Sequence, residues 1–382
     1  MRILITTGIF EPEAGGPAVY APNLARMLKV AGADITVVTY SDKANYDFDS
    51  EYPFRLVRVV RGKSKLRNYL NFLRVVWGEM KHAELVYSLD WIAAGLPVVV
   101  AAFFRRRPVV IRVGGDYMWE QKYLESGAEP MPLADFYERG LERRFALLFH
   151  IIRFVLHRAD HVVFNTDAQR ALYKRRYGLG EVRTSVIYNP SPRKDHFNFK
   201  RETANHELVF AGRFIVMKNV TSLIRAFTKA RLPDSYTLLL IGNGPQESEI
   251  RRLTVELGMH KRISIMHALR QQEMYARIKD CRAIILPSWT DISPNQVYEA
   301  LSFDIPVLVS KENYLSVRGQ LPEMLDPRSV DDITAKLEML ADEKRYQEFA
   351  TRCRAIHFTH SWDDVLKEHQ SVFKKVLDSQ SE

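Results

Sequence analysis

The chain has 382 residues, 46% hydrophobic and 26% charged, which excludes a disordered chain, a collagen-like fibre and a coiled-coil rod. This length suggests two or three domains, and two cysteines are too few for a disulfide framework, so a reducing compartment is expected. Residues 1–190 hold 27 basic and 20 acidic residues, +7 of the net +9, which fits an acidic partner or plain solubility equally well.

Strands and helices alternate through the first half. Strands are predicted at Arg2–Thr7, Ile35–Tyr40, Phe54–Val60, Leu85–Ser88, Val109–Val113, His161–Asn165 and Ser185–Tyr188. Helices are predicted at Val19–Ala31, Leu66–Met80, Ile92–Phe104, about Ala134–Arg158 and Asp167–Tyr177. The chain opens directly on a strand, so we expect no signal peptide, and no stretch is long and apolar enough to predict a membrane-spanning helix.

A polar, proline-containing segment, Asn189–Asp195, fits an inter-domain linker. The alternation then resumes. Strands are predicted at Glu207–Ala211, Tyr236–Ile241, Ile263–Met266, Ala283–Pro287 and Val307–Val309. Helices are predicted at Asn219–Ala230, Gln246–Leu257, Gln272–Lys279, Gln296–Phe303, Val330–Leu340 and Lys344–His357, and a last one begins near Ser361.

This order predicts an α/β fold of two doubly wound, Rossmann-like domains facing across a cleft, over residues 1–190 and 195–358, followed by a terminal helix in 359–382. In such sheets, ligands bind at the carboxyl ends of the strands. The cleft between the domains is therefore the expected site.

Two cations follow the first strand of the second half. Arg213 comes directly after Gly212 at the strand end, and Lys218 precedes a helix. An arginine fork and a lysine point charge beside a helix N-terminus suit a diphosphate, although both cations could also be ordinary solvated side chains.

Two further loops follow strand ends. Asp291 lies eight residues before Glu299, so both carboxylates could bind sugar hydroxyls, or Asp291 could cap a turn and Glu299 face solvent. The turn Gly242-Asn243-Gly244-Pro245 permits close backbone approach, and a tight strand-to-helix turn explains it equally.

Together these features resemble the family-4 retaining glycosyltransferases, which have the GT-B architecture of two Rossmann-like domains. The resemblance covers nearly the whole chain. It includes Gly15-Gly16, Gly212-Arg213 with Lys218, the Gly242–Pro245 turn, Leu286-Pro287-Ser288, the Asp291–Glu299 pair and a closing Ser361-Trp362 helix. In that family the closing helix crosses back to the first domain.

The resemblance implies transfer of a hexose from a nucleotide-diphosphate donor with retention at the anomeric carbon, in bacterial-type glycan or cell-surface polysaccharide synthesis. It implies no metal cofactor, because basic side chains and a helix N-terminus neutralise the diphosphate. Arg213 and Lys218 would bind the diphosphate and stabilise its developing charge. Glu299 would hold the ribose hydroxyls.

The resemblance also gives roles to residues on both sides of the donor. Asp291 would face hydroxyls of the donor sugar, and Gly16 would let the first-domain loop approach it closely. Asp116, after Gly114-Gly115, would lie near the sugar, although a turn aspartate fits the sequence equally. The remaining donor-binding candidates are Gly212, Gly242, Asn243, Asn295 and Gln296.

The chain departs from the family around Asp291, where the family usually has a glutamate. The family continues with Gly-Phe-Gly, whereas this chain has Ile292-Ser293-Pro294. Pro294 has no backbone N–H, so one expected donor to the sugar or phosphate is missing, and Asn295 or Gln296 would replace it. The departure leaves the identity of the donor open.

The predicted helix over about Ala134–Arg158 combines a broad apolar face with basic side chains and a histidine, namely Arg139, Arg143, Arg144, Arg153, His157 and Arg158. Leu66–Arg74 and Arg105–Arg107 add further cations and aromatic rings. We expect a cytoplasmic enzyme, peripheral on the inner face of the membrane, with a glycan or lipid-linked acceptor and an anionic membrane surface as partners. A buried core helix with a charged outer face explains the same pattern.

Two other functions fit parts of this pattern. A sugar-nucleotide epimerase can share the architecture and bind the same donor without an acceptor. A non-enzymatic protein could bind nucleic acid through the basic first half, but the sequence has no helix-turn-helix spacing, RNA-binding aromatic signature or zinc-ligand pattern, so no nucleic acid is expected. The 11 histidines show no metal-binding spacing, so no metal is expected.

Overall fold

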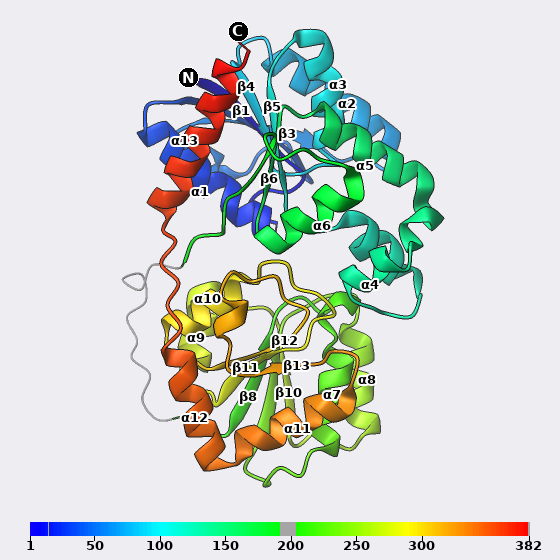
Figure 1. The fold of residues 1–382 in the computed structure, drawn as a ribbon, viewed down its shortest axis with the longest axis vertical. Coiled ribbons are helices and arrows are strands. Elements are labelled where there is room, and N and C mark those ends of the chain that lie inside the picture. Colours follow the sequence, from blue (N-terminus) through cyan, green and yellow to red (C-terminus); the bar gives the residue numbers. More distant parts are fainter. Residues whose placement is uncertain (14, 192–203, 381–382) are drawn as a thin grey trace. The chain divides into compact units, whose positions relative to one another are not determined.

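The computed structural model describes residues 1–13, 15–191 and 204–380, and the chain divides into two compact units (Figure 1). Unit 1 comprises Met1–Met118, Gly140–Tyr188 and Trp362–Glu382, and unit 2 comprises Trp119–Arg139 and Asn189–Ser361. The sequence predicted one continuous first domain over 1–190, whereas the structure groups Trp119–Arg139 with unit 2. The Pro192–Asp195 part of the predicted linker lies outside the described residues.

Unit 1 contains a seven-stranded, fully parallel sheet in the order β3-β2-β1-β4-β5-β6-β7. The strands are β1 (Arg2–Thr7), β2 (Asp34–Ser41), β3 (Arg55–Val60), β4 (Leu85–Ser88), β5 (Val109–Val113), β6 (His161–Phe164) and β7 (Thr184–Val186). Every residue of β4, β5 and β6 is buried, as expected for strands of a parallel sheet that crossover helices cover.

The helices of unit 1 connect these strands in chain order. They are α1 (Gly16–Val30), α2 (Lys65–Glu79), α3 (Gly95–Arg105), α5 (Ala146–Arg158) and α6 (Asp167–Tyr177), and α13 (Trp362–Asp378) ends the chain. Helix α13 is part of the unit 1 core, because Val365 and Phe373 are fully buried there and Tyr87 Oη lies 2.8 Å from His369 Nε2. No helix of the described residues is long and apolar enough to cross a membrane.

Unit 2 contains a six-stranded parallel sheet in the order β10-β9-β8-β11-β12-β13. The strands are β8 (Glu207–Ala211), β9 (Thr237–Ile241), β10 (Ile263–Met266), β11 (Ala283–Leu286), β12 (Val307–Ser310) and β13 (Met324–Leu325). The helices are α4 (Leu133–Glu138), α7 (Val220–Lys229), α8 (Glu247–Glu256), α9 (Gln271–Ile278), α10 (Asn295–Ser302), α11 (Val330–Ala341) and α12 (Glu343–Arg354).

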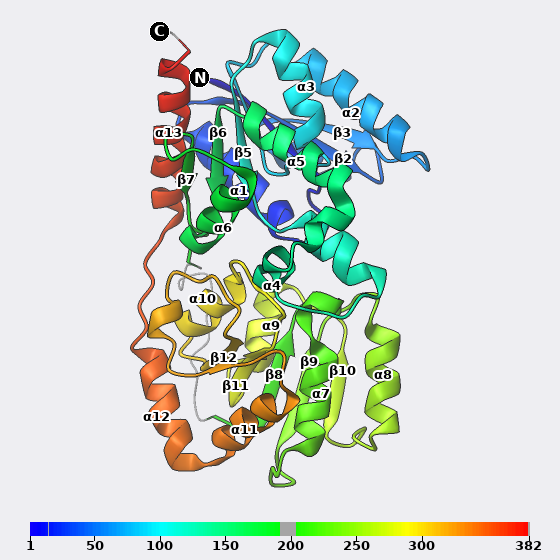
Figure 2. The ribbon, with the colours of Figure 1, turned by 45° about the vertical axis from the view of Figure 1, so that its right-hand side comes forward.

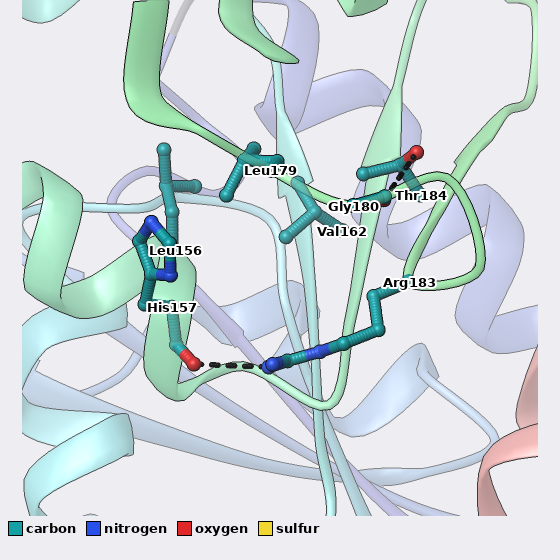
Figure 3. Close-up of a pocket in the computed structure, with 7 residues that line it drawn as sticks. All are labelled: Leu156, His157, Val162, Leu179, Gly180, Arg183 and Thr184. Atoms are coloured by element: carbon teal, nitrogen blue, oxygen red, sulfur yellow. Dashed lines mark hydrogen bonds between the residues drawn. The ribbon is translucent and has the colours of Figure 1, made fainter.

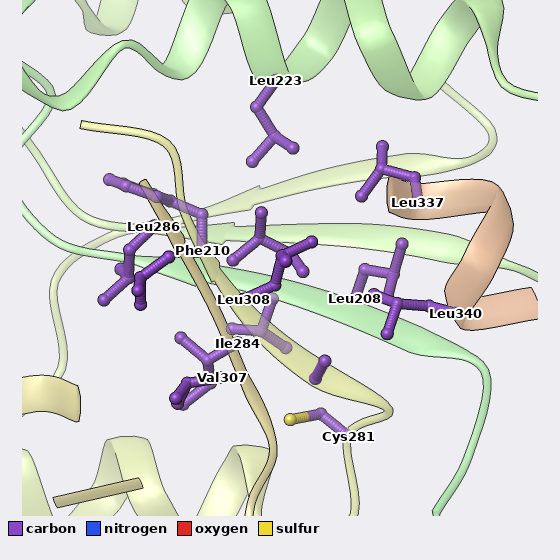
Figure 4. Close-up of a cluster of buried hydrophobic side chains, with 14 of the residues drawn as sticks. Leu208, Phe210, Leu223, Cys281, Ile284, Leu286, Val307, Leu308, Leu337 and Leu340 are labelled. Carbon is purple, nitrogen blue, oxygen red and sulfur yellow. The ribbon is translucent and has the colours of Figure 1, made fainter. Parts of the chain in front are cut away.

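Branched and aromatic side chains fill the core of unit 2 (Figure 4). Phe210 of β8, Ile284 of β11 and Leu308 of β12 are fully buried, and Leu223 of α7 and Leu337 of α11 pack against the sheet. The two predicted domains are therefore confirmed as parallel α/β sheets of the Rossmann type. Strand β13 was not predicted, because two residues are too few to show a periodic pattern.

The single helix predicted over about Ala134–Arg158 is wrong. The structure has α4, a 3₁₀ turn at Leu141–Phe145 and then α5. Gly140 takes a left-handed conformation with φ of 66°, and Phe145 leaves helical geometry with φ −120° and ψ 39°. The apolar spacing continues through both breaks, so sequence periodicity could not detect them.

Candidate active site

The centre of the unit 2 sheet is a switch point in the strand order. Strand β8 lies between β9 and β11, so the chain moves outward in one direction from β8 and then continues on the other side from β11. Loops after such neighbouring strands diverge and leave a crevice at their carboxyl ends. Gly212-Arg213 follow β8, and Pro287 to Asp291 follow β11, so the candidate residues lie at this point.

Lys218 and Asp291 are in direct contact. Lys218 Nζ lies 2.7 Å from Asp291 Oδ2, and the two side chains are 18% and 13% exposed. Ser288 Oγ donates to the same carboxylate oxygen at 3.0 Å. Lys218 and Asp291 are 73 residues apart, and the sequence made both of them site candidates. In the structure they form one half-buried ion pair that a ligand could still reach.

Hydrogen bonds fix the residue next to Lys218 and the backbone of Asp291. Asn219, at φ 55° and 4% exposed, donates its side-chain amide to the carbonyl oxygens of Pro287 and Pro327 at 3.2 and 3.0 Å. The Asp291 N–H donates to the Glu312 carbonyl at 3.0 Å, and the Asp291 carbonyl accepts from Tyr314 N–H at 3.0 Å. The ion pair is thus held from both adjacent loops before any ligand binds.

Arg213 is exposed at the end of β8. Across the described ranges, its guanidinium makes no hydrogen bond or ion pair. It is therefore a cation at the carboxyl edge of the sheet that is available to an anionic ligand.

The glycine turn after β9 is a packing requirement of the fold. A Cβ on Gly242 would lie 1.9 Å from the Gly212 carbonyl oxygen, and one on Gly244 would lie 2.4 Å from the Phe214 carbonyl oxygen. The Phe214 N–H also donates to the Asn243 carbonyl at 2.8 Å. These glycines therefore hold the loop that carries Arg213, while contact of Gly242 and Asn243 with a donor stays a prediction.

Glu299 does not lie on a solvated face. Its carboxylate accepts hydrogen bonds from Tyr275 Oη at 2.6 Å and from Gln271 Nε2 at 2.7 Å, both on α9. Burial raises the pKa of Glu299, and the hydrogen bonds from Tyr275 and Gln271 lower it in part. A carboxylate fixed in this way is suited to accept a hydrogen bond from a ligand hydroxyl.

The N-cap residue of α10 is Pro294, which has no backbone N–H. Pro294 caps the helix through its carbonyl, which accepts from Val297 N–H at 3.0 Å. Asn295 Oδ1 accepts from Asn189 Nδ2 at 2.8 Å, and the Gln296 side chain is half-buried. The helix N-terminus still presents backbone N–H groups after Pro294, since the first turn of a helix leaves its amides without helical partners.

The two site candidates of unit 1, Asp116 and Gly16, differ in burial and in contacts. Asp116 is fully buried, and its carboxylate accepts from Tyr173 Oη at 2.6 Å, an arrangement that favours the structural alternative over a contact with sugar. Gly16 is the first residue of α1 and exposed, and a Cβ there would meet no atom within 4 Å. The packing of unit 1 therefore gives no reason for the glycine, which leaves close approach of a ligand as its predicted role.

Sequence reasoning missed the segment Trp119–Arg139 in unit 2. The Leu133 N–H donates to Thr290 Oγ1 at 2.9 Å, next to Asp291. Arg328 donates to both carboxylate oxygens of Asp135 at 3.0 and 3.1 Å and to Glu312 Oε1 at 2.6 Å. No local pattern could predict these bonds, because Arg328 and Asp135 are 193 residues apart.

A small cavity of about 20 Å³ lies between α5, β6 and the loop before β7 in unit 1 (Figure 3). Its lining includes His157, whose carbonyl accepts from Arg183 Nη2 at 2.9 Å. None of the predicted site residues lines it. The described residues include no group of three or more His, Cys, Asp or Glu side chains placed to hold a metal ion.

Comparison with known proteins agrees with this geometry. A model of the glycosyl transferase 4-like domain matches residues 15–190, and a model of the glycosyl transferases group 1 matches residues 192–354. D-inositol 3-phosphate glycosyltransferase of Pseudarthrobacter chlorophenolicus is 22% identical over 91% of this chain and 87% of its own. The chain spans only 24% and 44% of the length of two other curated relatives that it matches.

The fold is also similar to solved glycosyltransferases. Sucrose-phosphate synthase from Thermosynechococcus elongatus superposes with a TM-score of 0.76 at 16% identity, over 99% of both chains. Anabaena HepE in complex with UDP and glucose superposes with a TM-score of 0.74 at 15% identity, over 98% of this chain and 100% of that one.

The two parallel α/β units and their fold neighbours define the GT-B class. Since glycosyl transferase models match nearly all of both halves, the chain belongs to the glycosyltransferases of the GT-B type.

Proposed function

We propose that this chain is a family-4 retaining glycosyltransferase that moves a hexose from a nucleotide-diphosphate donor to an acceptor of a bacterial-type glycan or cell-surface polysaccharide. One observation supports this most. Lys218, held 2.7 Å from Asp291, lies with the exposed Arg213 at the switch point of the unit 2 sheet. Two cations and a carboxylate at one strand edge match a ligand with a diphosphate at one end and hydroxyls at the other.

Each side chain has a chemical task in this proposal. Arg213 offers a planar fork of N–H donors and Lys218 a point charge, and together they bind the phosphate oxygens. When the bond between the anomeric carbon and the phosphate oxygen breaks, its electron pair stays on the phosphate. Fixed cations at that oxygen stabilise the developing charge without reorganising, which lowers the barrier.

The carboxylates recognise hydroxyls. Asp291, already in contact with Lys218, accepts from hydroxyls of the donor sugar, and Glu299 accepts from the ribose. Because Arg213, Lys218 and the α10 N-terminus supply positive charge, we propose that turnover needs no metal ion. Turnover that a chelator leaves unchanged would agree with this part of the proposal.

The acceptor is proposed to be a glycan or a lipid-linked, amphiphilic molecule. An enzyme that acts on such an acceptor works where the acceptor is embedded, so we propose a peripheral association with the inner face of the membrane. The basic excess of residues 1–190 supports this, since an anionic leaflet attracts basic proteins.

A thermal-shift panel of nucleoside diphosphates and nucleotide sugars tests the donor site. Uridine compounds come first, because HepE was solved with UDP and glucose. We expect one nucleoside diphosphate to raise the Tm of the full chain and Lys218→Ala to lose that shift. A panel without any shift would contradict the proposal. Conversion of the sugar nucleotide without acceptor would instead indicate an epimerase.

A further inference from the structure

Three neighbouring helices of unit 1 share one outer surface. Helix α3 packs against both α2 and α5, and Figures 1 and 2 show the three side by side. The Trp77 ring of α2 lies 6.1 Å from the Phe104 ring of α3, and the Arg158 guanidinium of α5 lies 4.3 Å over the Phe103 ring. We call this face of α2, α3 and α5 the three-helix surface.

Large apolar side chains on this surface are exposed to solvent. Phe103 is 59% and Phe104 66% exposed, in the last turn of α3. In the described part of unit 2, Val255 is the one exposed large hydrophobic residue. The three-helix surface has seven, namely Leu66, Leu70, Trp77, Phe103, Phe104, Leu147 and Phe154. Such a cluster indicates an interaction site.

The charge of the same surface has one sign. Helices α2, α3 and α5 contain one acidic residue, Glu79, which is ion-paired with Arg55 at 3.0 Å. The basic residues of the three helices are Lys65, Arg67, Arg74, Arg105, Arg153 and Arg158, and Arg106 and Arg107 follow α3 directly. The partner of this surface must therefore be anionic and must also accept apolar side chains.

Two arginine guanidinium groups lie directly over aromatic rings of this surface. Arg105 is 4.3 Å over the Trp77 ring, as Arg158 is over Phe103. An arginine that covers a ring with its stem and head keeps its charge at the boundary of the apolar patch. Aromatic rings bordered by cations are the arrangement that stabilises proteins at the headgroup level of a bilayer.

We infer that the three-helix surface docks this chain on an anionic lipid bilayer, with Phe103, Phe104 and Trp77 entering the headgroup region. A nucleic acid would meet the same cations and could stack on the rings, but the exposed aliphatic Leu66, Leu70 and Leu147 add nothing to base stacking and favour a bilayer. This inference rests on the proposed function in one respect. An amphiphilic acceptor gives the reason why the enzyme would bind at the membrane. The sequence predicted this role for a helix over 134–158 together with Leu66–Arg74 and Arg105–Arg107. In the structure these segments lie on α2, at the end of α3 and, for the second part of the predicted helix, on α5.

Flotation of the full chain with lipid vesicles tests the inference. We expect the protein to float at low salt with vesicles of phosphatidylcholine mixed with phosphatidylglycerol, and not with phosphatidylcholine alone. Charge reversal by Arg67→Glu with Arg74→Glu should weaken binding at least about thirty-fold, since two cations are lost at about 1 kcal/mol each and the new carboxylates add repulsion. Phe103→Ser with Phe104→Ser should weaken binding at every salt concentration.

Matched variants keep the result interpretable. Arg225→Glu with Lys261→Glu changes the net charge equally at exposed positions of unit 2, and Val255→Ser removes an exposed apolar side chain there. Both controls should float like the wild type. No flotation of the wild type, equal loss in the controls, or preference for duplex DNA or RNA over vesicles would overturn the inference. Flotation measures no transfer, and a nucleoside-diphosphate thermal shift in the same variants reports the donor site separately.

Discussion

The two units share the order of their first six strands, which unit 1 extends by β7, but they place their functional groups differently. In both sheets the order reverses beside the first strand, at β1 and β4 in unit 1 and at β8 and β11 in unit 2. At the carboxyl edge of unit 2, Lys218 and Asp291 form a half-buried pair that a ligand can reach, whereas Asp116 of unit 1 is fully buried. Most of the exposed large apolar side chains in the described part of unit 1 lie instead on α2, α3 and α5. The strand order therefore provides possible sites, and the loop and helix sequences decide which of them carries chemistry.

Removing the Lys218 charge should give the largest effect. Lys218→Ala is expected to lower kcat by roughly 10²–10³-fold, the loss typical of a fixed group that stabilises transition-state charge. Lys311→Ala is the matched control, because Lys311 Nζ also lies 2.7 Å from an aspartate, Asp326, after the neighbouring strand β12. Equal losses of turnover in the two variants would show that Lys218 acts only as a structural ion pair.

Replacing a glycine of the unit 2 turn should affect folding more than binding. Gly242→Ala puts a methyl group 1.9 Å from the Gly212 carbonyl oxygen, so we expect the free energy of unfolding to fall by at least about 1–3 kcal/mol. Gly78→Ala at the end of α2 meets no atom within 4 Å and should raise it by about 0.5–1 kcal/mol. Denaturant unfolding of both variants checks this. A Gly242→Ala variant as stable as the wild type would mean that the loops after β8 and β9 do not pack closely against each other.

Neutralising Glu299 should weaken ligand binding without lowering the free energy of unfolding at neutral pH. Burial raises the pKa of Glu299, so its effect on stability is present at low pH and is lost as the pH rises through that pKa. Glu299→Gln should therefore unfold at neutral pH no more easily than the wild type. It should bind nucleoside diphosphate roughly ten- to a hundred-fold more weakly, the value of a hydrogen bond to a charged group.

Calorimetric titration at neutral pH measures this affinity, with the exposed Glu256→Gln on α8 as control. Unchanged affinity in Glu299→Gln would remove Glu299 from the ribose site.

The alternation of strands and helices could be predicted from the sequence because each unit buries short apolar strands between amphipathic helices. Strand β1 was predicted with the bounds that the structure shows, and so was β8. The cations and carboxylates of the unit 2 site could be singled out because they lie in the segments that follow predicted strands or at the start of the next helix. Their mutual contact could not be predicted, since Lys218 and Asp291 are 73 residues apart.

Other features depend on the three-dimensional packing. The helix predicted through Gly140 is broken by a backbone conformation that apolar periodicity does not record. The bonds between Arg328 and Asp135, which attach Trp119–Arg139 to unit 2, join residues with no local signal. The full burial of Asp116 beside Tyr173 likewise follows from how α6 packs on the sheet, and not from the Gly114-Gly115-Asp116 motif.

The crystal structure of the chain with a nucleoside diphosphate from the thermal-shift panel tests the donor site most directly. The phosphate oxygens should lie within hydrogen-bonding distance of both Arg213 and Lys218, with the ribose hydroxyls at Glu299. A diphosphate bound elsewhere, or Arg213 still directed to solvent in the complex, would contradict the proposed site.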